Sequence, residues 1–155
     1  MLTAKTIERG AMQTVAIELL QDLPASGAAP APFFSDLSAP AHIAQLGRHL
    51  LSQEPEIRQY VFLLDAEQKL FAFMEVPSER VAALIVRDVF RFALLDNAAS
   101  VAFCALRSGG VVPRAGDYAL LQQLSEAAGV LGLQLYDHLL VSNDEYYSFR
   151  ELGLL

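Results

Sequence analysis

Apolar residues recur along this chain at two spacings, one typical of helices and the other of strands. Four-residue spacing from Ile7 to Leu19 predicts an amphipathic helix over residues 5–22. Further helical patterns cover residues 38–52, 78–95 and 117–130, and apolar runs typical of strands cover 60–65, 69–76, 100–106, 133–141 and 146–149. This alternation predicts an α/β domain with a mixed β-sheet flanked by α-helices.

The helix over residues 78–95 offers a core face that can be read from its spacing. Its apolar positions are Val81, Leu84, Ile85, Val89, Phe92 and Leu95. We expect these side chains to pack on the sheet.

A Pro/Ala-rich connection, LPASGAAPAPFF over residues 23–34, separates the first predicted helix from the rest. It predicts two parts, an N-terminal helix with its connection over 1–37 and a globular domain over 38–155. The N-terminal helix either packs on the domain's own surface or docks a partner.

Composition narrows the classes of function. The 155 residues are 54% hydrophobic and 19% charged, as in a compact globular domain. A formal net charge of −7 argues against direct nucleic-acid binding, which depends on a basic face. Cys104 is the single cysteine, so no internal disulfide can form, and there is neither a signal peptide nor an apolar run of transmembrane length. We therefore expect a cytoplasmic protein with no membrane contact.

The stretch VAFCALRSGGVVPRAGD, residues 101–117, carries the candidate chemistry. An apolar strand breaks at Ser108 and two glycines, and a helix resumes near Asp117. The stretch resembles, without a gap, the signature H-x-H-P-S-G-x-x-x-P-S-x-x-D of the RadC-like JAB/MPN domain. Matching positions are Ser108, Gly109, Pro113 and Asp117; differing ones are Cys104 and Leu106 at the histidines, Arg107 at the proline and Arg114 at the second serine.

Three other blocks resemble the same family in the same order. Residues 60–70 are similar to its F-x-V-L-L-L-D-x-x-N-x-L opening, and residues 87–99, RDVFRFALLDNAA, to its R-E-x-x-(K/R)-x-A-L-x-x-N-A-A helix. Residues 133–155 resemble its terminal L-x-x-x-D-H-(I/L)-I-V-x-x-x-x-Y-x-S-(F/L)-x-E-x-G hairpin. The resemblance covers residues 38–155 and implies the JAB/MPN (cytidine-deaminase-like) fold. The helix-hairpin-helix module that often precedes this domain has no counterpart in residues 1–37.

In active members of the superfamily, the resemblance implies a zinc ion held by two histidines and an aspartate. A glutamate on an earlier strand serves as base and a serine assists the oxyanion. Asp117 falls on the aspartate position and Glu75 is the closest match to the glutamate, with Glu79 as the alternative. Leu106 cannot bind metal, whereas Cys104 is either a small core residue or a thiolate ligand.

The resemblance places His138 on a late strand that supplies no zinc ligand. We therefore expect no metal, no other cofactor and no catalytic residue at the degenerate positions, which are Glu75, Cys104, Leu106, Ser108, Arg114 and Asp117.

Two arginines appear in the loop that has lost its histidines. We hypothesise that Arg107 or Arg114 pairs with Asp117 and occupies the place of the zinc ion, because a guanidinium offsets the cost of burying a carboxylate. The alternative is that both arginines are ordinary loop charges.

Three functions compete. The first is a catalytically inactive RadC-like domain, a pseudoenzyme that acts in protein interaction or scaffolding, through a partner protein or self-association. The second is a metallopeptidase-like hydrolase with an altered site, either zinc-dependent or using the Cys104 thiol with His138 as base. The third is the DNA-repair role historically attached to the family.

Overall fold

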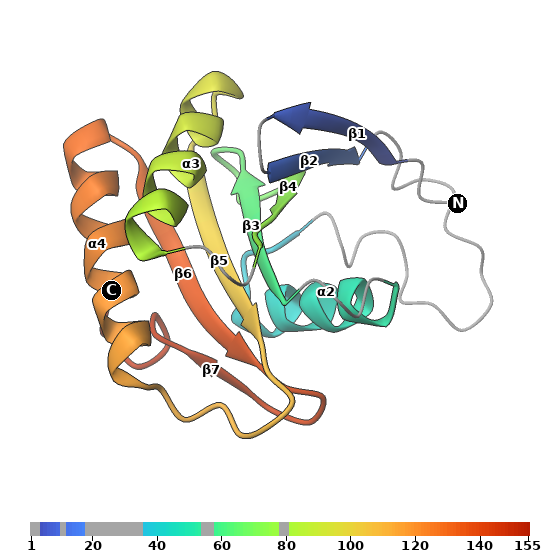
Figure 1. The fold of residues 1–155 in the computed structure, drawn as a ribbon, viewed down its shortest axis with the longest axis vertical. Coiled ribbons are helices and arrows are strands. Elements are labelled where there is room, and N and C mark those ends of the chain that lie inside the picture. The colour runs from blue at the N-terminus through green and yellow to red at the C-terminus, as the bar shows by residue number, and fades with distance from the viewer. Residues whose placement is uncertain (1–3, 10–11, 18–35, 54–57, 78–80) are drawn as a thin grey trace.

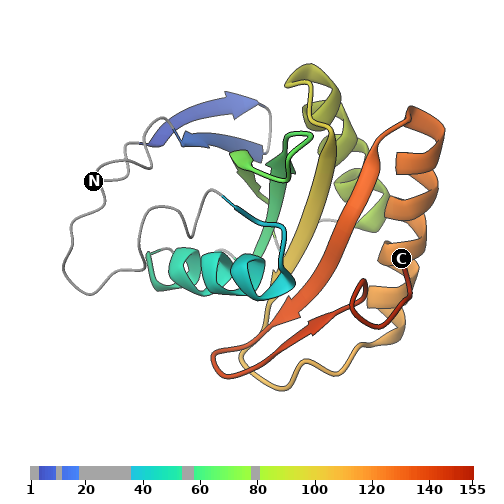
Figure 2. The same ribbon diagram turned by 180° about the vertical axis from the view of Figure 1, so that it is seen from behind.

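The computed structural model describes residues 4–9, 12–17, 36–53, 58–77 and 81–155. Within these ranges, seven strands form one sheet in the order β1-β2-β4-β3-β5-β6-β7. The β5–β6 pair is parallel and the other neighbours are antiparallel. Helix α2 covers one face of the sheet, and helices α3 and α4 cover the other (Figures 1 and 2). The mixed sheet flanked by helices confirms the predicted α/β fold class.

The strands predicted after residue 38 are present, with small changes at their ends. They are β3 (Gln59–Leu64), β4 (Leu70–Glu75), β5 (Ser100–Leu106), β6 (Gln134–Val141) and β7 (Tyr146–Ser148). Every residue of β5 is buried, because helices pack on both of its faces. This buried strand ends at the candidate site.

The N-terminal helix predicted over residues 5–22 is wrong. The described residues there form two antiparallel strands, β1 (Ala4–Arg9) and β2 (Met12–Ile17), and β2 pairs with β4. The segment is rich in β-branched residues, which favour strands: Thr6, Ile7, Thr14, Val15 and Ile17. Pairing with β4 is a tertiary effect that local spacing does not report. The connection over residues 23–34 lies outside the described residues, and the division at residue 38 stays a prediction.

Helix α2 (Pro40–Gln53) begins with a proline at its first helical position, where the missing N–H has no helical partner to lose. Its inner face buries Ile43, Leu46 and Leu50. These side chains form a core with alternate residues of β3, β5 and β6.

Helix α3 (Ala82–Leu95) faces the sheet with a different stripe from the predicted one. Ile85, Val89 and Phe92 are buried as expected, together with Phe90 and Ala93. The three remaining positions are exposed: Val81 by 62%, Leu84 by 36% and Leu95 by 60%. Val81 is the N-cap and lies outside the helical turns, so the spacing does not apply to it.

Helix α4 (Ala115–Leu131) packs on the same face as α3, through Leu120, Leu121, Leu124 and Ala128. It ends at Gly132, whose φ of 69° is the left-handed conformation that terminates helices. Among the described residues no helix has both the length and the hydropathy needed to cross a membrane.

Candidate functional site

The candidate site lies where β5 ends beside its parallel neighbour β6. The chain leaves β5 at Leu106, passes through a loop and enters α4 at Ala115 (Figure 1). Carboxyl ends of parallel strands commonly carry functional groups, because the loops that follow them converge there. The predicted positions from Cys104 to Asp117 all belong to this segment.

Arg107 and Asp117 form an ion pair across the loop. The guanidinium donates through Nη2 to Oδ1 of Asp117, and the two side chains are only 17% and 13% exposed. Nη1 donates to the carbonyl oxygen of Val112 at 3.3 Å, and the Arg107 backbone N–H donates to Val141 of β6 at 2.8 Å. Arg107 thus joins both parallel strands to the loop and to the first turn of α4.

The second carboxylate oxygen of Asp117 is also occupied. Oδ2 accepts the backbone N–H of Arg114 at 2.7 Å, which places a negative charge at the helix N-terminus, where it is favoured. Burial raises the pKa of Asp117, but the hydrogen bonds from Arg107 and Arg114 together outweigh it and hold that pKa below its usual value. Asp117 is therefore an ionised residue with donors on both oxygens.

The prediction that a loop arginine pairs with Asp117 is confirmed for Arg107. Arg114 contributes its backbone N–H, and its side chain is exposed. Ser108 is exposed in the loop after β5.

Cys104 and Leu106, at the histidine positions, point to the opposite side of the sheet from α3 and α4. Both belong to the core under α2, and Cys104 is fully buried. Gly47 of α2 lies against them: a β-carbon there would be 2.9 Å from the Cys104 sulfur and 3.2 Å from Cδ2 of Leu106. This glycine was not among the predicted site residues, and its only signal in the sequence is its place inside a helical pattern.

The Cys104 environment keeps its thiol protonated. Burial, together with the Asp137 carboxylate, raises the pKa of the thiol to about 12, against a lowering effect of Arg48. The thiolate is the form that attacks substrates and binds metals, so Cys104 is a core residue in this setting.

Glu75 ends β4 and is partly buried. It lies opposite Tyr60 of β3, and Tyr60 lies opposite Cys104 of β5. Directly opposite residues share one face of a sheet, so Glu75 and Cys104 are on the same face, about 10 Å apart at two strand spacings. The buried Tyr60 ring stands between them. The alternative base, Glu79, lies outside the described residues.

His138 of β6 is fully buried close to the Arg107–Asp117 pair. Its ring packs against Phe103 at 5.2 Å and Phe149 at 4.9 Å between centroids, and neither ring nitrogen has a hydrogen-bond partner. Burial lowers its pKa to about 4, with Asp117 acting to raise it and Arg107 to lower it. His138 is thus neutral at pH 7.

The neighbouring Asp137 organises the terminal hairpin. Its carboxylate accepts the backbone N–H groups of His138 at 2.7 Å and Arg150 at 3.1 Å, and the Ser148 hydroxyl at 2.5 Å. Burial raises the pKa of Asp137, against the effect of these three donors. The family resemblance covers the Asp-His pair but does not predict this network, whose signal in the sequence is the serine of the terminal block.

The donors present do not fit the zinc ion that the signature implies. Asp117 is held by two donors, Leu106 has no ligand atom, and Cys104 is a protonated thiol packed beneath α2. Across the described ranges, no three His, Cys, Asp or Glu side chains are grouped closely enough to hold a metal ion. An open zinc site needs three protein ligands and a free position for water.

Comparison with known proteins identifies the family. A model of the RadC-like JAB domain matches residues 37–154. A UPF0758 protein of Trichlorobacter lovleyi is 30% identical over 121 residues, which cover 76% of this chain and 53% of the relative. A UPF0758 protein of Clostridium perfringens is 29% identical over 125 residues, and one of Janthinobacterium sp. is 31% identical over 122. In both cases the match covers 77% of this chain and 54% of the relative. The chain spans about half the length of the curated relatives it matches. It belongs to the RadC-like JAB domain family.

Proposed function

We propose that this chain is a metal-free RadC-like JAB domain that acts as a protein-interaction or scaffolding module rather than as a hydrolase. The single observation that carries the proposal is the Arg107–Asp117 ion pair at the aspartate of the metal signature. The guanidinium places a positive charge on the carboxylate that would bind the zinc ion in an active member.

The physical reason for this substitution is the cost of a buried charge. A carboxylate taken out of water without a partner loses several kcal/mol of solvation. A dication offsets that loss in a metal site, and here a planar guanidinium does so with directed hydrogen bonds. The loop therefore keeps its aspartate for a structural reason, as the N-terminal charge of α4.

Hydrolysis has little support from the remaining groups. Cys104 is buried and protonated, and the imidazole of His138 lies on the other face of the sheet. Glu75 lies on the α2 face of the sheet, whereas Asp117 belongs to α4, which packs on the other face. The cytoplasm remains the location we expect for this domain.

Zinc binding in solution tests the proposal. We expect protein purified with zinc in the medium and dialysed without chelator to hold far less than one zinc per chain. We also expect no peptidase activity on ubiquitin-like or short peptide substrates. Asp117→Asn should leave the zinc content unchanged, with Asp144→Asn, on an exposed turn, as the matched control. One zinc per chain, lost in Asp117→Asn but kept in Asp144→Asn, would overturn the proposal.

A further inference from the structure

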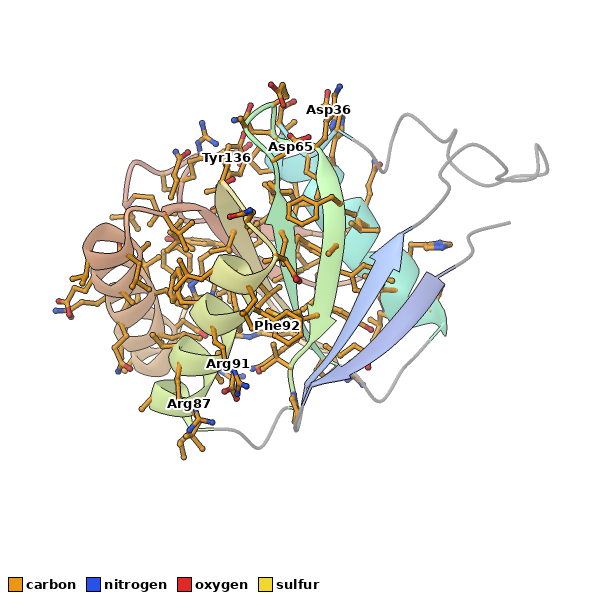
Figure 3. The ribbon with its side chains drawn as sticks, turned by 90° about the horizontal axis from the view of Figure 1, so that it is seen from above. Asp36, Asp65, Arg87, Arg91, Phe92 and Tyr136 are labelled. Carbon is orange, nitrogen blue, oxygen red and sulfur yellow. The ribbon has the colours of Figure 1, made fainter. Side chains whose placement is uncertain are left out.

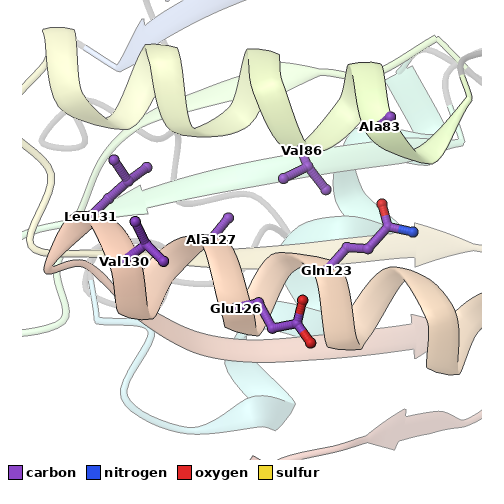
Figure 4. Close-up of a pocket in the computed structure, with 7 residues that line it drawn as sticks. All are labelled: Ala83, Val86, Gln123, Glu126, Ala127, Val130 and Leu131. Carbon is purple, nitrogen blue, oxygen red and sulfur yellow. The ribbon is translucent and has the colours of Figure 1, made fainter.

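The outer surface of α3 and α4 carries exposed apolar side chains at the carboxyl ends of both helices. Both helices run in the same direction, so these ends lie at the same end of the helical layer (Figures 1 and 4). The apolar side chains are Leu94 (48% exposed) and Leu95 (60%) on α3, and Val130 (86%) and Leu131 (42%) on α4. We call this surface, with the groove between the helices, the α3–α4 face.

The groove itself is apolar and open. It has a volume of about 510 Å³, and Ala83, Val86, Ala127 and Val130 provide most of its lining (Figure 4). Gln123 and Glu126 are its polar residues. A surface helix normally presents charged side chains to water, yet Glu126 is the one charged residue on α4 after its first turn. Exposed apolar surface of this kind marks an interaction site.

Charged residues of opposite sign lie on the two helices: Glu126 of α4 is in the groove lining, whereas Arg87 and Arg91 of α3 lie on the outer surface beyond it. Arg87 and Arg91 project from α3 away from the sheet, whereas Phe92 points toward the strands (Figure 3). Arg87 pairs with Asp88 at 3.0 Å, but Arg91 has no ion pair with any described residue. On α4, the Glu126 carboxylate accepts a hydrogen bond from Gln122 at 2.9 Å.

This pattern of charge is self-complementary. A two-fold axis through the groove would bring Arg91 of one copy to Glu126 of the other, and the same contact would form twice. A strongly basic or strongly acidic partner would leave one of the two charges facing its own sign. The chain carries a net charge of −7, so two copies repel each other over most of their surface. The α3–α4 face carries Arg87 and Arg91 as well as Glu126, so the repulsion between two copies is offset there.

We propose that the partner of this domain is a second copy of the chain, bound face to face through the α3–α4 face as a two-fold symmetric dimer. Val130 of each copy packs into the groove of the other, and Arg91 pairs with Glu126 across the interface. This inference rests on the proposed function, because it names the partner of the interaction module.

Sedimentation equilibrium over a range of protein concentrations tests the dimer. The wild-type chain should show a monomer–dimer equilibrium, and Val130→Glu should weaken the dissociation constant by about tenfold or more. The matched control is Val112→Glu, which places the same charge at a residue that is 77% exposed in the loop before α4. It should change the dissociation constant little.

A charge exchange gives a second, independent test. Arg91→Glu and Glu126→Arg should each weaken the dimer, and the double variant should restore it toward the wild-type value. All these residues are exposed, and circular dichroism verifies that each variant is folded.

A chain that stays monomeric at every concentration would overturn the dimer, as would a dimer that Val130→Glu and the charge exchange leave unchanged. Zinc content, measured on the same samples, reports on the proposed function separately. A zinc-bound dimer would contradict the metal-free proposal and leave the dimer standing. A zinc-free monomer would contradict the dimer and leave the metal-free proposal standing.

Discussion

Gly47 of α2 lies so close to Cys104 of β5 that a β-carbon at residue 47 would be 2.9 Å from the Cys104 sulfur. The helix backbone therefore covers the position of the first lost histidine. An imidazole is much larger than a thiol, so Cys104→His needs α2 to move outward. The packing beneath α2 and the Arg107–Asp117 pair are the two features that support the metal-free proposal.

Gly47→Ala should destabilise the domain, because the new methyl group enters the space of the Cys104 sulfur. We expect a loss of about 1–3 kcal/mol in the free energy of unfolding, measured by urea denaturation. The double variant Gly47→Ala/Cys104→Ala should recover part of that loss.

Gly129→Ala is the matched control. A β-carbon at that position of α4 meets nothing within 4 Å, so alanine should stabilise the helix by about 0.5–1 kcal/mol. Equal effects at residues 47 and 129 would contradict the close approach of α2 to β5.

Arg107→Ala should be costly, because it leaves the Asp117 carboxylate partly buried without its cation. We expect a loss of about 2–4 kcal/mol in unfolding free energy. Arg114→Ala is the matched control, since its side chain is exposed and its backbone N–H still reaches Asp117, and it should lie within about 0.5 kcal/mol of the wild type.

A double-mutant cycle with Asp117→Asn isolates the ion pair. Asp117→Asn/Arg107→Ala should cost less than the sum of the two single variants. Additive losses would show that the two side chains do not interact.

His138 makes stability depend on pH in an acidic window. Its pKa is lowered by burial to about 4, whereas an unfolded chain has about 6.5, so the unfolded state takes up the proton first as pH falls. The neutral ring makes its full contribution to the free energy of unfolding above about pH 6.5. This contribution, about 3 kcal/mol, is lost as the pH falls from about 6.5 to 4. Asp117, whose pKa is lowered, loses its contribution only below its unfolded pKa of about 3.9.

His138→Phe keeps an aromatic ring between Phe103 and Phe149 and removes the titration. Urea denaturation at several pH values should give a shallower slope for the variant than for the wild type in this window. Burial raises the pKa of Asp137, so this residue increases the free energy of unfolding as the pH falls. It does so in both proteins, and its effect therefore cancels when the two slopes are compared. Parallel slopes for the two proteins would contradict a neutral, buried His138.

Cys104 should be unreactive in the folded protein. Its thiol is fully buried and burial raises the pKa to about 12, so a thiol reagent at pH 8 should label it only after denaturation. The labelling rate, followed by absorbance with an aromatic disulfide reagent, measures this directly. Rapid labelling of the native chain would favour the thiol-hydrolase reading instead.

Local patterns predicted most of the fold after residue 38, because strand and helix periods are properties of neighbouring residues. Ser100–Leu106 is the clearest case, since its bounds are those of β5. The N-terminal strands were missed because their pairing with β4 comes from sequence-distant contacts. The prediction of which face of α3 is buried was only partly right, because the orientation of this helix depends on how it packs beside α4.

The sequence offered two arginines as possible partners of Asp117, and the structure is needed to choose between them. Arg107 extends from the end of β5, where Val141 holds its backbone and aims its guanidinium at α4. Arg114 is the N-cap of α4, a position that presents its N–H, not its side chain, to a residue three positions later. The groove between α3 and α4 also depends on the packing of two distant helices.

A crystal structure with diffraction recorded on both sides of the zinc absorption edge, from crystals grown with zinc, tests the central claim most directly. We predict no anomalous peak near Asp117 and the Arg107 guanidinium hydrogen-bonded to its carboxylate. A full-occupancy peak bound by Asp117, with Arg107 turned away into solvent, would contradict the account.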